Sequence, residues 1–159
     1  MNKICICGSV VVFKGRKTFI LHHKKFNLWL YCGGHREENE TPYETVLREA
    51  QEEAGMKIKI LNPDQKEGRL LADKRAYQLP RPFTILQQHV KYKEARHEHF
   101  DMIYLAKLVS MKKDKNTEKH ETKWIKEPEI DGLKTFDNVK WSLHKAFSIM
   151  KKNNYFEGK

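Results

Sequence analysis

Cysteine is scarce in this chain, with three residues among 159: Cys5, Cys7 and Cys32. Their number is odd, and no pair has the C-x-x-C spacing of common zinc and redox motifs, so the sequence predicts neither a disulfide framework nor a zinc site. Such usage is typical of proteins in a reducing compartment, and we therefore expect a cytoplasmic location.

Long apolar runs are also lacking. The apolar start of the chain, residues 1–13, is shorter than the roughly 20 residues that a membrane-spanning helix needs, and Lys14, Arg16 and Lys17 follow it directly. Neither a membrane span nor a secretory signal is therefore expected. Internal repeats and linker-like stretches are missing as well, so we predict a single domain over residues 1–159.

Acidic residues are outnumbered, with 21 against 31 Lys and Arg, which gives a formal net charge of +10. The lysines are scattered and do not form a patch with interleaved aromatic residues, so nucleic acid is a partner that we do not favour. A basic surface would also attract polyphosphates by long-range steering. Seven of the 21 acids, however, lie between Glu37 and Glu53.

Residues 41–55 carry the local signals of a helix. Thr41 is placed to be the N-cap, Pro42 the first helical residue, and Glu44 the partner of Thr41 in a capping box. Gly55 would end the helix. The helical spacing predicts an apolar stripe that faces the core, formed by Tyr43, Val46, Leu47, Ala50 and Ala54.

Three acids of this helix, Glu49, Glu52 and Glu53, are spaced to share one side, on the solvent-facing edge of the stripe and with no Lys or Arg among them. Each pair of like charges should cost about 0.2–0.5 kcal/mol. An acidic helix face is most often merely solvated, but a hard divalent cation, which prefers oxygen ligands, would explain this concentration of charge. The sequence therefore predicts a magnesium site.

The same stretch matches the pattern G-x5-E-x7-R-E-U-x-E-E-x-G-U, in which U is an apolar residue. Ala50 and Met56 occupy its apolar positions, and its fixed positions are filled by Gly34, Glu40, Arg48, Glu49, Glu52, Glu53 and Gly55. The chain thus resembles the Nudix (MutT-like) hydrolases. The resemblance implies an α/β/α sandwich around a central mixed sheet, in the α+β or α/β class, with a loop–helix–loop catalytic box.

The resemblance also implies a hydrolase that uses Mg²⁺ or Mn²⁺ to cleave a pyrophosphate bond in a nucleoside diphosphate joined to another group. Glu49, Glu53 and the carbonyl of Gly33 would be metal ligands, and Glu52 would bind a further metal or take a proton from water. The remaining fixed residues would be structural, with an ion pair between two of them: Gly34, Glu40, Arg48 and Gly55.

A second acid from a later loop is often used by Nudix enzymes, and two candidates occur here. Glu98 lies between two predicted strands, and Glu121 is its rival. A carboxylate that already binds Mg²⁺ is a weaker base than a free one. We therefore favour Glu98 slightly over Glu52 as the proton acceptor, because a loop can reposition when substrate arrives.

Two histidine-containing stretches have alternative interpretations. His97 and His99 flank Glu98 and offer metal ligands, but a lone His-x-His does not define a site, and a charged strand end has about equal weight. Residues 22–25, His-His-Lys-Lys, could meet substrate phosphates, although such a charge run is more often plain surface.

The other predicted elements complete an alternation of strands and helices. Residues 14–16 should turn the first two strands into a hairpin, with Cys5 and Cys7 on one face, and residues 112–120 should form a charged, solvated connection. The closing helix would bury Phe136, Val139, Leu143, Phe147 and Met150. We expect strands at residues 3–13, 18–22, 29–31, 56–61, 69–72, 83–92, 100–109 and 122–126, and the closing helix at 136–152.

Three functions fit these features. The first is a pyrophosphohydrolase of small nucleotides such as nucleoside triphosphates, dinucleoside polyphosphates or nucleotide sugars. The second is an RNA 5′-end pyrophosphohydrolase, which would need a basic groove leading from Glu49 and Glu53. The third is a non-catalytic Nudix-like binding module, which ought to have lost some of its box acids, whereas this chain retains them all.

Overall fold

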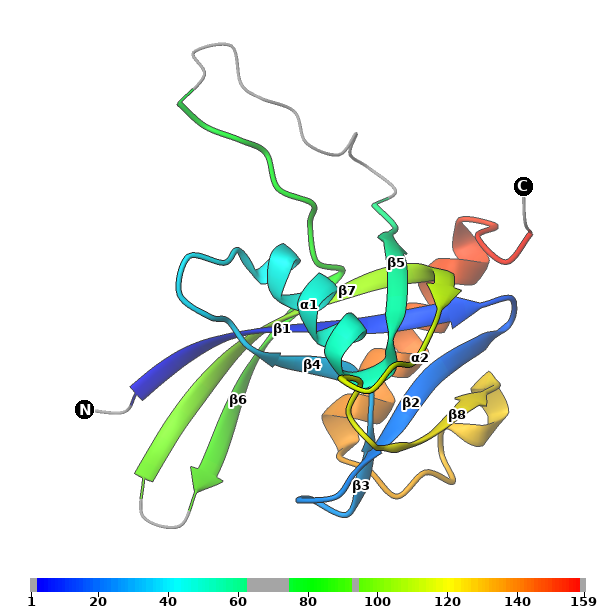
Figure 1. The fold of residues 1–159 in the computed structure, drawn as a ribbon. Coiled ribbons are helices and arrows are strands. Elements are labelled where there is room, and N and C mark those ends of the chain that lie inside the picture. The colour runs from blue at the N-terminus through cyan, green and yellow to red at the C-terminus, as the bar shows by residue number, and fades with distance from the viewer. Residues whose placement is uncertain (1–2, 63–74, 93–94, 158–159) are drawn as a thin grey trace.

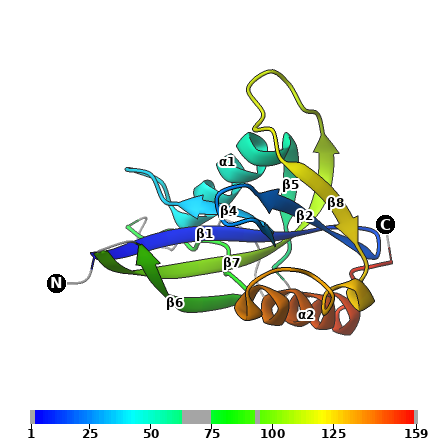
Figure 2. The ribbon, with the colours of Figure 1, turned by 90° about the horizontal axis from the view of Figure 1, so that it is seen from below.

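The computed structural model describes residues 3–62, 75–92 and 95–157. One mixed sheet forms the centre, with helix α1 on one face and helix α2 on the other, which is the predicted α/β/α sandwich (Figures 1 and 2). The elements in chain order are β1 (Lys3–Lys14), β2 (Lys17–His23), β3 (Leu28–Leu30), β4 (Cys32–His35), α1 (Pro42–Ala54), β5 (Met56–Ile60), β6 (Thr84–Tyr92), β7 (Ala95–Met111), β8 (Glu121–Ile125), the 3₁₀ turn η1 (Glu127–Glu129) and α2 (Asp137–Lys152).

Strand β1 is the organising strand of the sheet. It pairs antiparallel with β2 and β4, and parallel with β7 in a register that runs from Lys3 opposite His97 to Phe13 opposite Lys107. Strands β5 and β6 pair antiparallel with β7, and β3 and β8 pair with β2. The parallel β1–β7 pair makes this otherwise antiparallel sheet mixed.

The alternation of side chains along β1 divides the core between the two helices. Val10 and Val12 pack in the cluster that includes α1, whereas Val11 and Phe13 pack in the cluster that includes α2. A strand covered on both faces is expected to be apolar at successive positions, as residues 10–13 are. The middle of the sheet is therefore covered by one helix on each face.

Helix α1 forms as predicted. Thr41 accepts a hydrogen bond from the Glu44 backbone N–H, and the Glu44 side chain in turn accepts from the Thr41 backbone N–H, which completes the capping box. Gly55 ends the helix with φ of +64°. A Cβ at Gly55 would also lie 2.4 Å from the carbonyl oxygen of Lys112, so both conformation and space require glycine there.

Several predicted boundaries are wrong. Residues 32–35 form strand β4, although we predicted a strand in this region only at 29–31, because the hydrogen bonds of this segment to β1 override the low strand propensity of glycine. Strand β7 begins at Ala95 and not near Phe100. Phe136 is the N-cap of α2 and is 46% exposed, not buried, while the rest of the predicted stripe is buried. The predicted strand at 69–72 lies outside the described residues.

The hairpin of β1 and β2 and the strands β5, β6 and β8 agree with the sequence predictions. Neither helix α1 nor helix α2 is long and apolar enough to cross a membrane, and no other such helix occurs in the described part of the chain.

Candidate active site

Strand β4 and helix α1 meet where the box begins, and the contact is made directly between backbone and carboxylates. The Gly33 N–H donates a hydrogen bond to Glu53 Oε2 at 3.0 Å. A Cβ on Gly34 would lie 2.1 Å from Glu49 Oε1, so any other residue there would displace that carboxylate. Gly33 and Gly34 thus allow the carboxylates of Glu53 and Glu49 to lie directly against β4.

Glu53 is buried, with 7% of its surface exposed, which corrects our expectation that all three acids lie on a solvent-facing edge. Burial, and next the charge of Glu49, raises the pKa of Glu53 to about 8, despite the hydrogen bond from Gly33. Burial also raises the pKa of Glu49 above its usual range, while Arg48 opposes that shift. Ionising either carboxylate therefore carries a cost, which a bound cation would relieve.

Arg48 joins the acids together, so the expectation that no basic residue lies among them is wrong. Its guanidinium bonds both carboxylate oxygens of Glu40, at 2.7 and 3.1 Å, which confirms the predicted ion pair. It also donates to Glu49 and to Glu52, each at 3.0 Å, and to the carbonyl oxygen of His35 at 3.1 Å. The hydrogen bond to Arg48 is the main reason that the pKa of Glu40 falls to about 2.

The loop between β7 and β8 supplies an acid that the sequence reasoning missed. Glu118 donates its backbone N–H to the Glu52 carbonyl at 2.8 Å, and its carboxylate lies 2.6 Å from His120 Nε2. Ligand atoms of Glu53, Glu118 and His120 all lie within 4.8 Å of one another. This loop was predicted to be only a solvated connection, because its Lys-rich sequence hides the one acid and the one histidine that lie close to Glu53.

The loop is held in place by the end of helix α1. The Lys112 N–H donates to the Gly55 carbonyl at 2.8 Å, and Thr117 is buried and hydrogen-bonded to Asp114. Seven residues of this loop line a hollow of about 370 Å³: Lys113, Asp114, Lys115, Thr117, Glu118, Lys119 and His120. Three lysines therefore line the same hollow as Glu118.

Glu98 does not lie on a loop, which corrects the sequence prediction. It belongs to strand β7, opposite Ile4 of β1 and His89 of β6, and its carboxylate contacts Gln87 at 2.7 Å and His89 at 3.4 Å. A residue paired on both sides within a sheet lacks the freedom that favoured it as a proton acceptor. The rival, Glu121, is exposed at the start of β8.

The charge run at residues 22–25 reaches the edge of the site. His23 ends β2, and its ring stacks on His120 with centroids 6.1 Å apart. Burial is the main cause that lowers the pKa of His23, and the neighbouring His120 adds to it. The run is therefore adjacent to the loop of Glu118.

The opposite face of the same sheet collects other polar side chains. Asp101 is buried beside Gln88, whose side-chain amide donates to it at 3.2 Å, and burial raises the pKa of Asp101 to about 6. Two residues before Asp101 in β7, His99 lies between His97 and His35. Burial, followed by the two other imidazoles, lowers the pKa of His99 to about 4, so its ring is neutral near pH 7.

Comparison with known proteins agrees with the fold and the box. Residues 7–147 match the NUDIX domain, and the chain belongs to the NUDIX family. A hydrolase of the NUDIX family from Clostridium perfringens has a similar structure, with a TM-score of 0.73 and 24% identity, over 94% of this chain and 99% of that one. The Ap4A hydrolase of C. elegans superposes with a TM-score of 0.60 and 16% identity, over 92% and 98% of the two chains.

One curated relative is similar in sequence. It is a probable DHNTP pyrophosphohydrolase of Lactococcus lactis subsp. cremoris, 32% identical over 103 residues, which are 65% of this chain and 54% of the relative. The match thus spans about half the length of that relative.

Proteins of this family generally use a divalent metal, and the residues present fit one. The gathered donors are carboxylate oxygens, two of them on groups whose pKa is raised by burial, and glycine replaces a side chain that would fill the space beside Glu49. Oxygen donors in this number are the ligands that Mg²⁺ and Mn²⁺ prefer.

Proposed function

We propose that this chain is a pyrophosphohydrolase that requires Mg²⁺ or Mn²⁺ and cleaves a phosphoanhydride bond of a nucleoside diphosphate joined to another group. The observation that carries the proposal is the convergence of Glu49, Glu53 and Glu118 at the edge of β4. These acids come from two separate segments, so their convergence is not a by-product of one charged helix face.

Glu49 and Glu53 would hold the metal together with the carbonyl of Gly33. Within an antiparallel pair, the N–H and C=O of one residue point to the same side of the strand. Because the Gly33 N–H points to Glu53, its carbonyl is directed to the same edge of β4. A bound Mg²⁺ would screen the phosphate charge and make a water at the site more acidic.

Glu118 takes the place of Glu98 as the proton acceptor in this proposal. It is on a loop, its side chain is half exposed, and its partner His120 can share an accepted proton. Glu52 is the alternative base. Its carboxylate accepts a hydrogen bond from Arg48 at 3.0 Å, so it is less free to approach a water at the site.

The lysines beside Glu118 would meet the anionic substrate. Lys113, Lys115 and Lys119 line the hollow formed by their loop, and His23 brings the basic residues 24 and 25 to the same edge. Positive side chains at this place would orient a polyphosphate tail towards the acids.

The substrate is tested with a panel of compounds. The panel contains nucleoside triphosphates, dinucleoside polyphosphates, nucleotide sugars, DHNTP and 5′-triphosphorylated RNA, each with Mg²⁺, scored for phosphate against pyrophosphate release. Hydrolysis of at least one small nucleotide, lost in Glu53→Gln, is expected. Hydrolysis of RNA alone would instead indicate an RNA 5′-end pyrophosphohydrolase. If no compound is hydrolysed, the proposal that this chain is a pyrophosphohydrolase is contradicted.

We further infer that residues 1–159 act as one domain, because the two apolar clusters share strands β1 and β7. We also infer a cytoplasmic enzyme, which the three free thiols support.

A further inference from the structure

Five possible soft-metal ligands come together on the sheet face opposite α1. In β1, Cys5 and Cys7 have the same alternation as Val11 and Phe13, which pack towards α2. The strand registers place Cys7 opposite His35 of β4 and Cys5 opposite His99 of β7, and they add His97 to the same face of β7. The end of the sheet that carries them projects beyond both helices (Figures 1 and 2).

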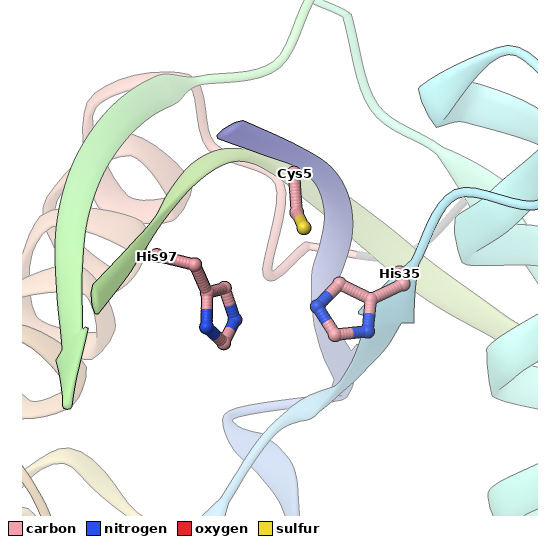
Figure 3. A group of neighbouring side chains, drawn as sticks. All are labelled: Cys5, His35 and His97. Atoms are coloured by element: carbon pink, nitrogen blue, oxygen red, sulfur yellow. The ribbon is translucent and has the colours of Figure 1, made fainter. Parts of the chain in front are cut away.

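The side chains form two overlapping groups that share His35. Ligand atoms of Cys5, His35 and His97 lie within 4.8 Å of one another, and so do those of Cys7, His35 and His99. Figure 3 shows the first group, in which the Cys5 sulfur and the two imidazole rings point toward a common space. The three residues come from three different strands.

The imidazole nitrogens are packed more closely than hydrogen bonding alone favours. His99 Nε2 lies 2.9 Å from His35 Nε2 and 2.8 Å from His97 Nε2. A ring nitrogen carries one hydrogen or one lone pair, so His99 Nε2 cannot make a separate linear hydrogen bond to each neighbour. A cation bound through the lone pairs of His35 and His97 would remove their competition for His99 Nε2.

We propose that Cys5, His35 and His97 form a binding site for a soft divalent transition-metal ion, with Zn²⁺ as the representative. A thiolate and two imidazoles are ligands that select Zn²⁺ over Mg²⁺. Three protein ligands leave the fourth tetrahedral position for water. Cys5 is chosen over Cys7 because Cys5 and His97 are partly exposed and His35 is exposed, so an ion can enter, whereas Cys7 is buried.

The ion would link the ends of β1, β4 and β7, which few other side chains cover. Ile4 and Ile6, on the other face of the same segment of β1, are 57% and 38% exposed, so apolar packing holds this end weakly. A metal bound across β1, β4 and β7 would fix these strands to one another. The site is distinct from the acid site, although both use β4, because His35 contributes its side chain here and only its carbonyl to Arg48.

The test uses Co²⁺ and Zn²⁺ with chelator-treated protein. All variants carry Glu53→Gln and excess Mg²⁺, so that binding by the group of Glu53, Glu118 and His120 is suppressed. Loss of an indirect, supporting contact to a ligand typically weakens metal affinity about 10–100-fold, so Cys5→Ser and His97→Gln are each expected to weaken Zn²⁺ binding at least about 100-fold. The parent should show the near-ultraviolet absorption of a Co²⁺–thiolate bond, and Cys5→Ser should abolish it.

Two matched variants complete the design. His89→Gln changes an exposed histidine on the other face of the same hairpin and should leave Zn²⁺ affinity unchanged. Cys7→Ser should weaken binding much less than Cys5→Ser. Zn²⁺ should raise the melting temperature of the parent and of His89→Gln, but not that of His97→Gln. The proposal is overturned by absence of the thiolate band, by unchanged affinity in His97→Gln, or by a greater loss in Cys7→Ser than in Cys5→Ser.

Discussion

The acid site and the Cys/His group both involve residues of the short strand β4, yet they were not equally visible in the sequence. Glu49 and Glu53 of the acid site belong to one helix, and their spacing in the sequence predicted the site. The Cys/His group takes its members from three strands, and only the registers of β1 with β4 and with β7 bring them together. Ligand patterns within one helix can be read from sequence, whereas patterns made by strand register require the fold.

The acid site and the Cys/His group also differ in their donor atoms, so they are expected to bind different cations. The acid site offers oxygens and suits hard cations, whereas the Cys/His group offers sulfur and nitrogen. Changes to the acid site are therefore expected to affect hydrolysis in the presence of Mg²⁺.

The largest effect is expected for Glu53→Gln, which should remove nearly all Mg²⁺-dependent turnover. The amide keeps the shape of the side chain and can still accept the hydrogen bond from Gly33, so the fold should be intact or slightly more stable. Turnover and melting temperature of the metal-free protein are measured together. A fully active, folded variant would contradict the assignment of the acid site.

The next effect concerns the loop acid. Glu118→Gln should lower turnover about 10²–10⁴-fold, the range for loss of a general base, with Mn²⁺ affinity little changed. Glu98→Gln and Glu121→Gln serve as controls and should lose much less. Titration of Mn²⁺ beside steady-state kinetics tests this, because a large loss of Mn²⁺ affinity would make Glu118 a ligand, and normal turnover would return the base role to Glu52.

Arg48→Ala is expected to reduce stability at least as clearly as turnover. The variant leaves Glu40 without its bidentate partner, and a lost charged hydrogen-bond network of this kind should cost about 2–4 kcal/mol. Arg48→Lys should recover little of it, since an ammonium cannot reproduce the planar fork. Urea unfolding measures the loss. An unchanged stability with lost activity would make Arg48 a catalytic residue.

The smallest effect is a pH dependence of the metal-free protein. The pKa of Glu53 is about 8 in the folded state, above its ordinary value of 4.5. The folded protein therefore keeps a proton that the unfolded chain has lost between these values, so the contribution of Glu53 to stability is full below about pH 4.5 and falls as pH rises through 8.

Unfolding free energies of the parent and of Glu53→Gln provide the measurement. Between pH 5 and pH 9 the parent should lose about 1–3 kcal/mol relative to the variant, and Mg²⁺ should restore the loss at pH 9. Parallel pH profiles for the two proteins would show that Glu53 is not protonated when folded, and the electrostatic account of the acid site would then be wrong.

Much of the fold could be predicted because local signals agree with it. The capping box at the start of α1 and the αL glycine at its end define the first and last residues of that helix. Glu118 could not be chosen from sequence, since its position depends on the Gly55–Lys112 contact and on a backbone hydrogen bond to Glu52. Glu98 was misplaced because the charged residues around it resemble a loop, whereas pairing with both β1 and β6 extends the strand through them.

The centre of the sheet closes only when β1 meets β7, and the first pair of that register joins positions 3 and 97, which are 94 positions apart. Such non-local pairing bears a large loop-closure entropy and is slow. A chain emerging from the ribosome completes helix α1 long before β7 exists. The nascent chain is therefore expected to expose the apolar sides of β1 and α1 until residue 107 is available, so chains truncated before Ala95 should show no slowly exchanging amide hydrogens in β1.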